Sequence, residues 1–167
     1  MSASEKPTWN GYRLGRPRSE CEWEAFRAIR RSVDFESEES PCDPGEDLAA
    51  GNYPLLLWLD GKPVGAIRID SLDNGGAAFR LVAIHPECQG QGHGRVLLRE
   101  AEDFARDIGC RKAVIYSTME AAGFYASAGY AEDTWDDQYF GGVVLMTKAL
   151  HYAGFIPPDG SDPPVGG

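Results

Sequence analysis

Short apolar runs bounded by turn residues dominate the first half of the chain and predict strands. The runs are residues 11–14 (GYRL), 55–59 (LLLWL), 64–69 (VGAIRI) and 78–84 (AFRLVAI). An Asp60-Gly61 pair separates the second run from the third, and Asn74-Gly75-Gly76 leads into the fourth. These turns predict a three-stranded antiparallel meander, to which the first run adds a short edge strand.

Apolar residues at helical spacing predict three helices. Residues 20–33 carry this pattern after a capping residue, Ser19. Residues 95–108 (RVLLREAEDFARDI) form the clearest amphipathic helix, which Gly109 ends. A third helical stretch runs from about residue 120 to 128.

Two further strands are predicted at residues 113–116 (AVIY) and 141–150 (GGVVLMTKAL). A strand that reaches the next strand through a helix is paired parallel to it. Residues 113–116 should therefore run parallel to the preceding strand. We predict an α+β fold in α/β/α layers, with a mixed, mostly antiparallel sheet of about six to seven strands and a central parallel pair.

The remaining segments carry weaker signals. Residues 36–52 (ESEESPCDPGEDLAAGN) are acidic and rich in helix breakers, which favours a solvated loop with a short helical turn. Residues 1–10 are polar and residues 151–167 are dense in Pro, Gly and Asp, so both ends are expected to be flexible. Residues 11–150 then form a single domain without visible internal repeats.

Length and charge limit the possible partners. A chain of 167 residues is the size of one ordinary domain, and one active site is expected. The formal net charge of -10 repels phosphate backbones and anionic lipid heads, so nucleic acids and membranes are not expected as partners. A local site could still hold one small anion.

The cysteines and the first residues indicate a compartment. Cys21, Cys42, Cys88 and Cys110 stand far apart, without a CxxC pair or a histidine at zinc-ligand spacing, so no metal is expected. The start MSASEKPTW lacks the features of a secretory signal, and no stretch approaches the roughly 20 apolar residues of a membrane span. A cytoplasmic protein with reduced thiols is the expectation.

The richest chemical signal is a glycine-rich loop, QGQGHG at residues 89–94, between a predicted strand and the clearest helix. Three glycines in six residues let consecutive backbone N–H groups converge, and the helix start adds unpaired donors and the positive end of its dipole. The pattern predicts an anion site, most naturally for phosphate. A plain tight turn is the alternative.

Two common phosphate loops are excluded by the residues that follow. A Walker A loop needs Gly-Lys and then Ser or Thr, but Gly94 precedes Arg95-Val96. A dinucleotide fingerprint needs a third glycine at position 95 or 97, which hold Arg95 and Leu97. Nucleotide hydrolysis and nicotinamide or flavin chemistry are therefore not expected.

Two motifs instead resemble those of the GNAT acetyltransferase superfamily. Gln89-x-x-Gly92-x-Gly94, after Ile84-His85-Pro86 and before a helix, is similar to the acyl-CoA pyrophosphate loop Q/R-x-x-G-x-G/A. Ala121-x-x-Phe124-Tyr125-x-x-x-Gly129-Tyr130 is similar to the second motif, A-x-x-x-Y-x-x-x-G-F. The resemblance covers roughly residues 11–150. It implies the GNAT fold, with a splayed central parallel pair, and acetyl-CoA as co-substrate.

The same resemblance implies how acetyl-CoA is held. Backbone amides of the glycine-rich loop would bind the pyrophosphate, and backbone groups on the strand before it would bind the pantetheine arm in the splay. The cofactor-binding residues so implied are Val82, Ile84, Gln89, Gly90, Gln91, Gly92, His93, Gly94, Arg95 and Thr118. His93 and Arg95 would add charge or hydrogen bonds, or else be solvated. Thr118 stands where the second motif often has Asn, and its hydroxyl could make a similar bond.

Tyr125 is, by the resemblance, the candidate general acid for the departing CoA thiolate. A phenol can donate a proton without carrying a charge at neutral pH. A packing aromatic is the alternative for Tyr125, and Phe124 and Tyr130 are expected in the core. No unique general base is visible. Candidates are His85, Glu36, Glu38, Glu39 and Asp70, whereas Cys88 and Cys110 lack a nucleophile's His/Asn setting.

Three residues are candidates for the acceptor site. Arg68 and Arg80 fall amid apolar residues on neighbouring predicted strands, and buried arginines usually have a partner. That partner is either an acid of this chain, such as Asp70 or Glu36, or an anionic group on the acceptor. Residues 28–38 weakly resemble a GNAT subgroup whose first helix reads R-x-x-V-F-x-x-E-Q, which suggests that Phe35 borders the acceptor site.

The sequence thus predicts an N-acetyltransferase that moves an acetyl group from acetyl-CoA to a primary amine of a small molecule or peptide in a ternary complex. Two alternatives stay open: a CoA-binding regulatory or sensor domain without turnover, and an enzyme that acetylates protein lysines or N-termini. Homodimers are frequent in the family, but no sequence feature here selects one.

Overall fold

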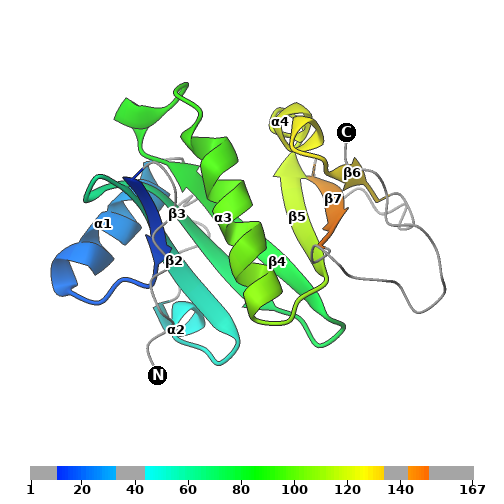
Figure 1. Cartoon of the computed structure of the whole chain (residues 1–167), viewed down its shortest axis with the longest axis horizontal. Coiled ribbons are helices and arrows are strands. Elements are labelled where there is room, and N and C mark those ends of the chain that lie inside the picture. Colours follow the sequence, from blue (N-terminus) through cyan, green and yellow to red (C-terminus); the bar gives the residue numbers. More distant parts are fainter. Residues whose placement is uncertain (1–10, 33–43, 134–142, 151–167) are drawn as a thin grey trace.

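The structure is a computed structural model that describes residues 11–32, 44–133 and 143–150 (Figure 1). Its strands are β1 (Tyr12–Gly15), β2 (Asn52–Leu59), β3 (Lys62–Ser71), β4 (Gly76–Ile84), β5 (Lys112–Thr118), β6 (Ala131–Glu132) and β7 (Val143–Ala149). Its helices are α1 (Glu20–Arg31), α2 (Pro44–Asp47), α3 (His93–Asp107) and α4 (Ala122–Ser127). The strands form one sheet in the order β1-β2-β3-β4-β5-β7-β6, and β4 and β5 are its parallel pair. The predicted mixed sheet is confirmed.

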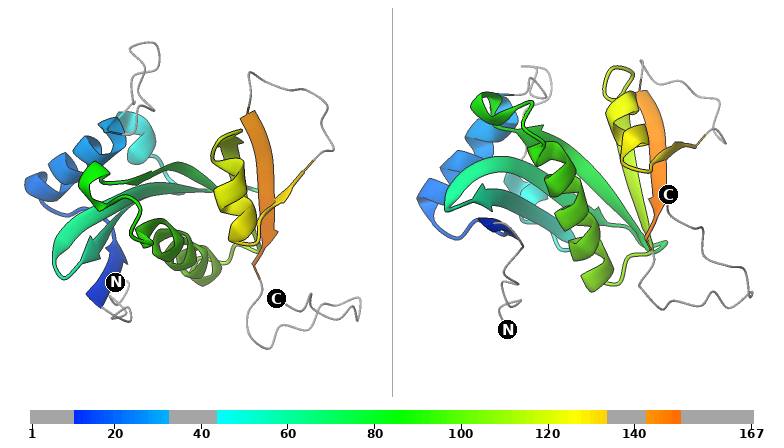
Figure 2. Two further views of the ribbon diagram at one scale, coloured as in Figure 1. Left: turned by 90° about the horizontal axis from the view of Figure 1, so that it is seen from above. Right: turned by 45° about the horizontal axis from the view of Figure 1, so that its top comes forward.

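Helices cover both faces of the sheet, as Figure 2 shows for α1 and α3. Strand β2 explains why LLLWL is apolar at every position, since successive side chains of a strand point to opposite faces. Leu55 and Leu57 join the core beneath α3, whereas Leu56 and Trp58 join a second core beneath α1. Helix α4 adds Tyr125 to the α3 side. The three-layer prediction therefore holds.

Local capping sets the ends of the main helices. The Ser19 hydroxyl accepts a hydrogen bond from the Glu22 N–H at 3.2 Å, and the Glu22 carboxylate accepts one from the Ser19 N–H at 3.0 Å, which is a capping box at the start of α1. Helix α3 ends at Gly109, whose φ of 91° lets the Cys110 N–H donate to the Ala105 carbonyl at 2.8 Å. Both predicted boundaries are confirmed.

Two features depart from the expectation. The short strand β6, which pairs with β7, was not predicted. The acidic segment does form a helical turn, α2, but its Asp47 is buried rather than solvated. The predicted flexible ends, residues 1–10 and 151–167, and residues 36–43 lie outside the described part of the chain.

Candidate active site

The glycine-rich loop connects the end of β4 to the start of α3. After a 3₁₀ turn at Pro86–Cys88, Gly90 and Gly92 take φ values of 75° and 89°, a backbone conformation that side chains disfavour. Gly92 is the N-cap of α3 and offers no side-chain acceptor, and none of the first-turn residues of α3 is acidic. The first N–H groups of the helix are thus left for an external anion.

Side chains within the loop hold it in place. Gln89 Nε2 donates to the Ile84 carbonyl at 3.2 Å, and Gln91 Nε2 donates to the Glu87 carbonyl at 3.4 Å. His93 is buried, with its Nε2 3.3 Å from Gln91 Oε1. The predicted loop residues therefore lie together, and the side chains of Gln89, Gln91 and His93 form hydrogen bonds within the protein. The backbone N–H groups of the loop are left as possible donors to an anion.

His93 also ties the loop to the edge of the sheet. Its Nδ1 lies 2.7 Å from the Tyr12 hydroxyl of β1, and the two rings meet edge to face. A neutral ring with its hydrogen on Nε2 accepts from Tyr12 and donates to Gln91. Sequence reasoning did not find Tyr12, because nothing local to residues 11–14 points to a partner some eighty positions away.

Gly94 allows α4 to approach α3. A Cβ at this position would lie 3.1 Å from Phe124 Cζ, so a larger residue would press on that ring. Beside it, Arg95 Nη2 donates to Ser127 Oγ on α4 at 3.1 Å. Gly94 and Arg95 thus connect the glycine-rich loop and the start of α3, which we call the anion loop, to the helix that carries Tyr125.

The parallel pair separates just past its first four residues. Strand β4 pairs with β5 from Gly76↔Lys112 to Phe79↔Ile115 and no further, and Figure 1 shows the two strands diverging toward α4. The divergence coincides with a bulge, where Leu81 takes a φ of 58° and the register to β3 shifts. The backbone of Val82 therefore lies on a β4 edge that β5 leaves unpaired.

Tyr125 lies on α4 and is 8% exposed, and its ring is in edge-to-face contact with Phe124 and Tyr130. Burial raises the pKa of Tyr125 to about 12, so its hydroxyl is protonated at neutral pH. Within the described residues this hydroxyl has no hydrogen-bond partner. A donor without a protein partner is suited to a ligand.

Thr118 ends β5 and shapes the turn into α4. Its Oγ1 accepts a hydrogen bond from the Ala121 N–H at 3.2 Å. The Thr118 hydroxyl thus orients the start of the helix that carries Tyr125, and its own O–H remains a donor, so its predicted bond to the cofactor stays a prediction.

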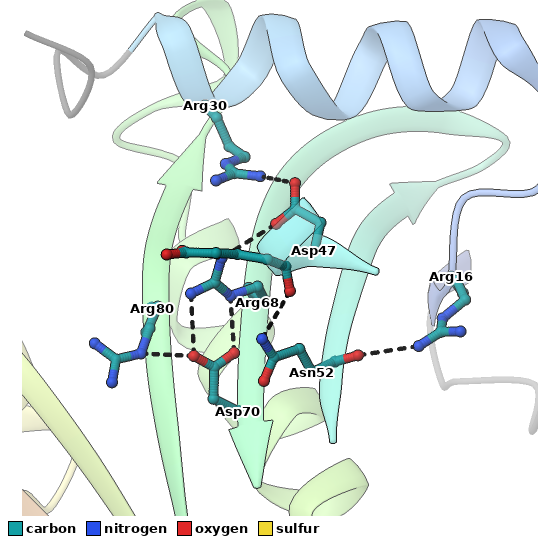
Figure 3. A network of polar contacts seen from close by, with 8 residues as sticks. Arg16, Arg30, Asp47, Asn52, Arg68, Asp70 and Arg80 are labelled. Carbon is teal, nitrogen blue, oxygen red and sulfur yellow. Dashed lines mark hydrogen bonds and ion pairs between the residues drawn. The ribbon is translucent and has the colours of Figure 1, made fainter. Parts of the chain in front are cut away.

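The two candidate acceptor arginines belong to one ion network, which Figure 3 shows in detail. Arg68 is buried and binds both oxygen atoms of Asp70, at 2.8 and 3.0 Å, and one oxygen of Asp47, at 3.3 Å. Burial alone would lower the pKa of Arg68, but Asp70 and Asp47 raise it above its ordinary value. Arg80 donates only its Nε, to Asp70 at 2.7 Å. Asp47 also binds Arg30 of α1 at 2.9 Å.

The candidate bases fare differently. Both oxygen atoms of Asp70 already accept hydrogen bonds, from Arg68 and Arg80. His85 caps the 3₁₀ turn, accepting a bond from the Glu87 N–H at 3.2 Å. Phe35 and the glutamates at 36, 38 and 39 lie outside the described residues.

Comparison with known proteins identifies the family. The sequence pattern of the Acetyltransferase (GNAT) family matches residues 19–130, which include the glycine-rich loop and both α3 and α4. The chain belongs to the Acetyltransferase (GNAT) family. This membership confirms the resemblance of the two motifs and makes an acyltransferase of the GNAT type the general class.

Solved structures show the same GNAT fold. A candidate N-acetyltransferase from Lactobacillus plantarum is 26% identical, with a TM-score of 0.68, covering 85% of this chain and 100% of that one. The ribosomal-protein-S18-alanine N-acetyltransferase of Escherichia coli is 19% identical, with a TM-score of 0.66, covering 86% and 96%. N-acetylglutamate synthase of Neisseria gonorrhoeae, complexed with coenzyme A and L-arginine, is 18% identical, with a TM-score of 0.67, covering 84% of this chain and 34% of that one.

None of the helices in the three described ranges is long and apolar enough to cross a membrane. No three His, Cys, Asp or Glu side chains of the described segments gather closely enough to hold a metal ion.

Proposed function

We propose that this GNAT protein is an N-acetyltransferase that moves the acetyl group of acetyl-CoA to a primary amine of a small molecule or peptide, by direct attack in a ternary complex. The observation that carries the proposal is Tyr125, a mostly buried residue whose protonated hydroxyl has no hydrogen-bond partner within the described residues. It stands on α4, directly after the strand that separates from β4.

The residues present fit acetyl-CoA as a substrate. The open N–H groups at Gly92 and the start of α3 would bind the pyrophosphate, because they combine converging donors with the positive end of a helix dipole. The unpaired edge of β4 at Val82 would bind the amide groups of the pantetheine arm as an added strand does. Ile84 would bind the pantetheine arm through its backbone N–H rather than its carbonyl, because the carbonyl already accepts a hydrogen bond from Gln89.

The reaction needs one proton donor at the leaving group. The neutral amine nitrogen attacks the thioester carbonyl carbon, a C–N bond forms, and the C–S bond breaks with its electron pair on sulfur. Tyr125 gives its hydroxyl proton to that sulfur, and the surplus proton of the amine leaves to water, from which Tyr125 is protonated again.

The test is CoA release from acetyl-CoA across a panel of primary amines, small molecules and peptides alike, with the acetylated amine identified by mass spectrometry. One amine that releases CoA and gains a single acetyl group in equal amounts supports the proposal. Tight acetyl-CoA binding without turnover on any amine would instead indicate a sensor domain. Covalent acetylation of the protein before the amine is added would contradict direct attack.

A further inference from the structure

Arg80 stands where β4 and β5 separate. The last β4–β5 pair is Phe79↔Ile115, so Arg80 and Tyr116 are the first residues beyond it on the two strands. The guanidinium carbon of Arg80 lies 5.9 Å from the centre of the Tyr116 ring, which is itself 59% exposed. The side chain of Arg80 thus crosses the point where the sheet opens.

The hydrogen bonds of Arg80 leave part of its guanidinium free. Its Nε donates to Asp70 at 2.7 Å, which fixes the direction of the group, while its two terminal amino groups make no hydrogen bond within the described residues. Its side chain is 41% exposed. Arg68 differs, because Asp70, Asp47 and Glu46 all bind it and its side chain is only 7% exposed.

The charge of Asp70 is shared between two arginines. Arg68 takes both of its oxygen atoms and Arg80 takes one of them again. Asp47 is likewise shared between Arg68 and Arg30. Three guanidinium groups therefore face two buried carboxylates, and Glu46, the third acid, is 62% exposed. Arg80 differs from Arg68 in that its terminal amino groups make no hydrogen bond within the described residues.

The position of Arg80 relative to the proposed catalytic acid is also informative. The ion network lies on the face that α1 and α2 cover, since Arg30 and Asp47 belong to it (Figure 3). Tyr125 packs in the core on the opposite face, beneath α3. Where β4 and β5 part, no sheet hydrogen bonds separate these faces, so an acceptor bound on one side can meet the acyl group held from the other.

We propose that Arg80 binds a carboxylate of the acceptor, so that the amine substrate is an amino acid or a similar amino carboxylate. The two terminal amino groups of a guanidinium match the two oxygen atoms of a carboxylate in one plane. Asp70 holds Arg80 ready for this contact. The net charge of -10 does not prevent such a local bond, because an amino acid carries both an ammonium and a carboxylate group. The proposal rests on the proposed acetyltransferase function.

The experiment compares matched acceptors: amino acids, their carboxamides, and the amines that lack the carboxyl group. We expect the wild-type protein to have a kcat/KM for at least one amino acid about tenfold or more above that for its carboxamide, and Arg80→Gln to remove this preference while acetyl-CoA KM is unchanged. Arg27→Gln is the control, because Arg27 is 44% exposed and its ion pair with Glu20 lies on the outside of α1. It should change nothing.

A second variant and a binding arm keep the test decisive. Arg80→Lys keeps the charge next to Asp70 and should recover only part of the preference, since an ammonium lacks the planar pair of donors. Binding of the same acceptors to the CoA-bound protein is measured by calorimetry. If acceptors bind only with their carboxylate and Arg80→Gln abolishes this binding, the inference is supported. If in addition no amine turns over, only the acetyltransferase function is refuted. Equal binding and turnover of acids and amides, or an aminophosphonate preferred over every carboxylate, would overturn the inference.

Discussion

Replacement of Gly92 by alanine tests whether the backbone of the anion loop, and not its side chains, binds CoA. Gly92 takes a φ of 89°, and a Cβ added to it would meet no atom within 4 Å. The substitution therefore causes no steric clash. Its effect comes only from the reluctance of residues with a Cβ to adopt this conformation.

The size of the effect follows from that conformational cost. A left-handed conformation costs a non-glycine residue about 1–2 kcal/mol. If the loop keeps its shape, the free energy of unfolding falls by this amount. If the free loop relaxes, binding must restore the shape, and the Kd for CoA rises by a factor of about 5–30, at roughly 1.4 kcal/mol for each tenfold change.

Gly109 provides a matched control at the other end of the same helix. Its φ is 91°, and a Cβ there would also meet nothing within 4 Å. Gly109→Ala should lower the free energy of unfolding by a similar amount without changing the Kd for CoA. The measurements are urea unfolding and calorimetric titration with CoA for both variants and the wild-type protein.

For Gly92→Ala, the loss in the free energy of unfolding and the loss in the free energy of CoA binding should add to about 1–2 kcal/mol. Gly92→Asn should recover part of either loss, because asparagine tolerates a left-handed conformation better than alanine. A Gly92→Ala protein that keeps both the wild-type free energy of unfolding and the wild-type affinity for CoA would refute the reasoning.

Three further predictions concern stability. Tyr125 has a pKa of about 12 in the folded protein against 10.0 in the unfolded chain, so its contribution to the free energy of unfolding is full below pH 10, and about 3 kcal/mol of it is lost as the pH rises through 12. Urea unfolding between pH 8 and 12 should therefore show a smaller loss of stability in Tyr125→Phe than in the wild-type protein, and equal losses would contradict this. Asp47→Asn leaves Arg30 without its buried carboxylate and should cost about 3–5 kcal/mol of unfolding free energy, whereas a cost below about 1 kcal/mol would show that the network is dispensable. Gly65→Ala should lower the free energy of unfolding by about 1–3 kcal/mol, because the added Cβ would lie 3.2 Å from a backbone carbonyl oxygen. Gly123→Ala should raise it by up to about 1 kcal/mol, because a Cβ there would meet no atom within 4 Å and alanine favours a helix; the reverse order of melting temperatures would contradict both.

Local signals predicted most of the fold. The Ser19 and Glu22 side chains bond the backbone within one helical turn, so the start of α1 could be found without knowing the rest of the molecule. The Asp60-Gly61 turn likewise depends on two residues with positive φ. Helix α3 begins at His93, two residues before the predicted start, because the prediction excluded Gly94 as a weak helix former. The structure places Gly94 in the first turn, where the missing side chain leaves room for Phe124.

The site was predictable where it depends on motifs and not where it depends on distant contacts. The order of glycines predicted an anion-binding loop, and the resemblance of the second motif to the GNAT family predicted Tyr125 as the general acid; both roles stay predictions. The partners Tyr12 and Asp47 were missed, since each meets its partner only through the folded sheet. Tyr116 was missed for the same reason, because its place opposite Arg80 depends on where two strands separate.

The turnover of Tyr125→Phe, compared with its affinity for acetyl-CoA, tests the central claim most directly. The substitution removes one hydroxyl from a ring that stays packed against Phe124 and Tyr130. We predict that kcat falls by about a hundredfold or more, as for loss of a general acid, while the Kd for acetyl-CoA stays within about twofold. An unchanged kcat would contradict the assignment of Tyr125 as the acid that protonates CoA.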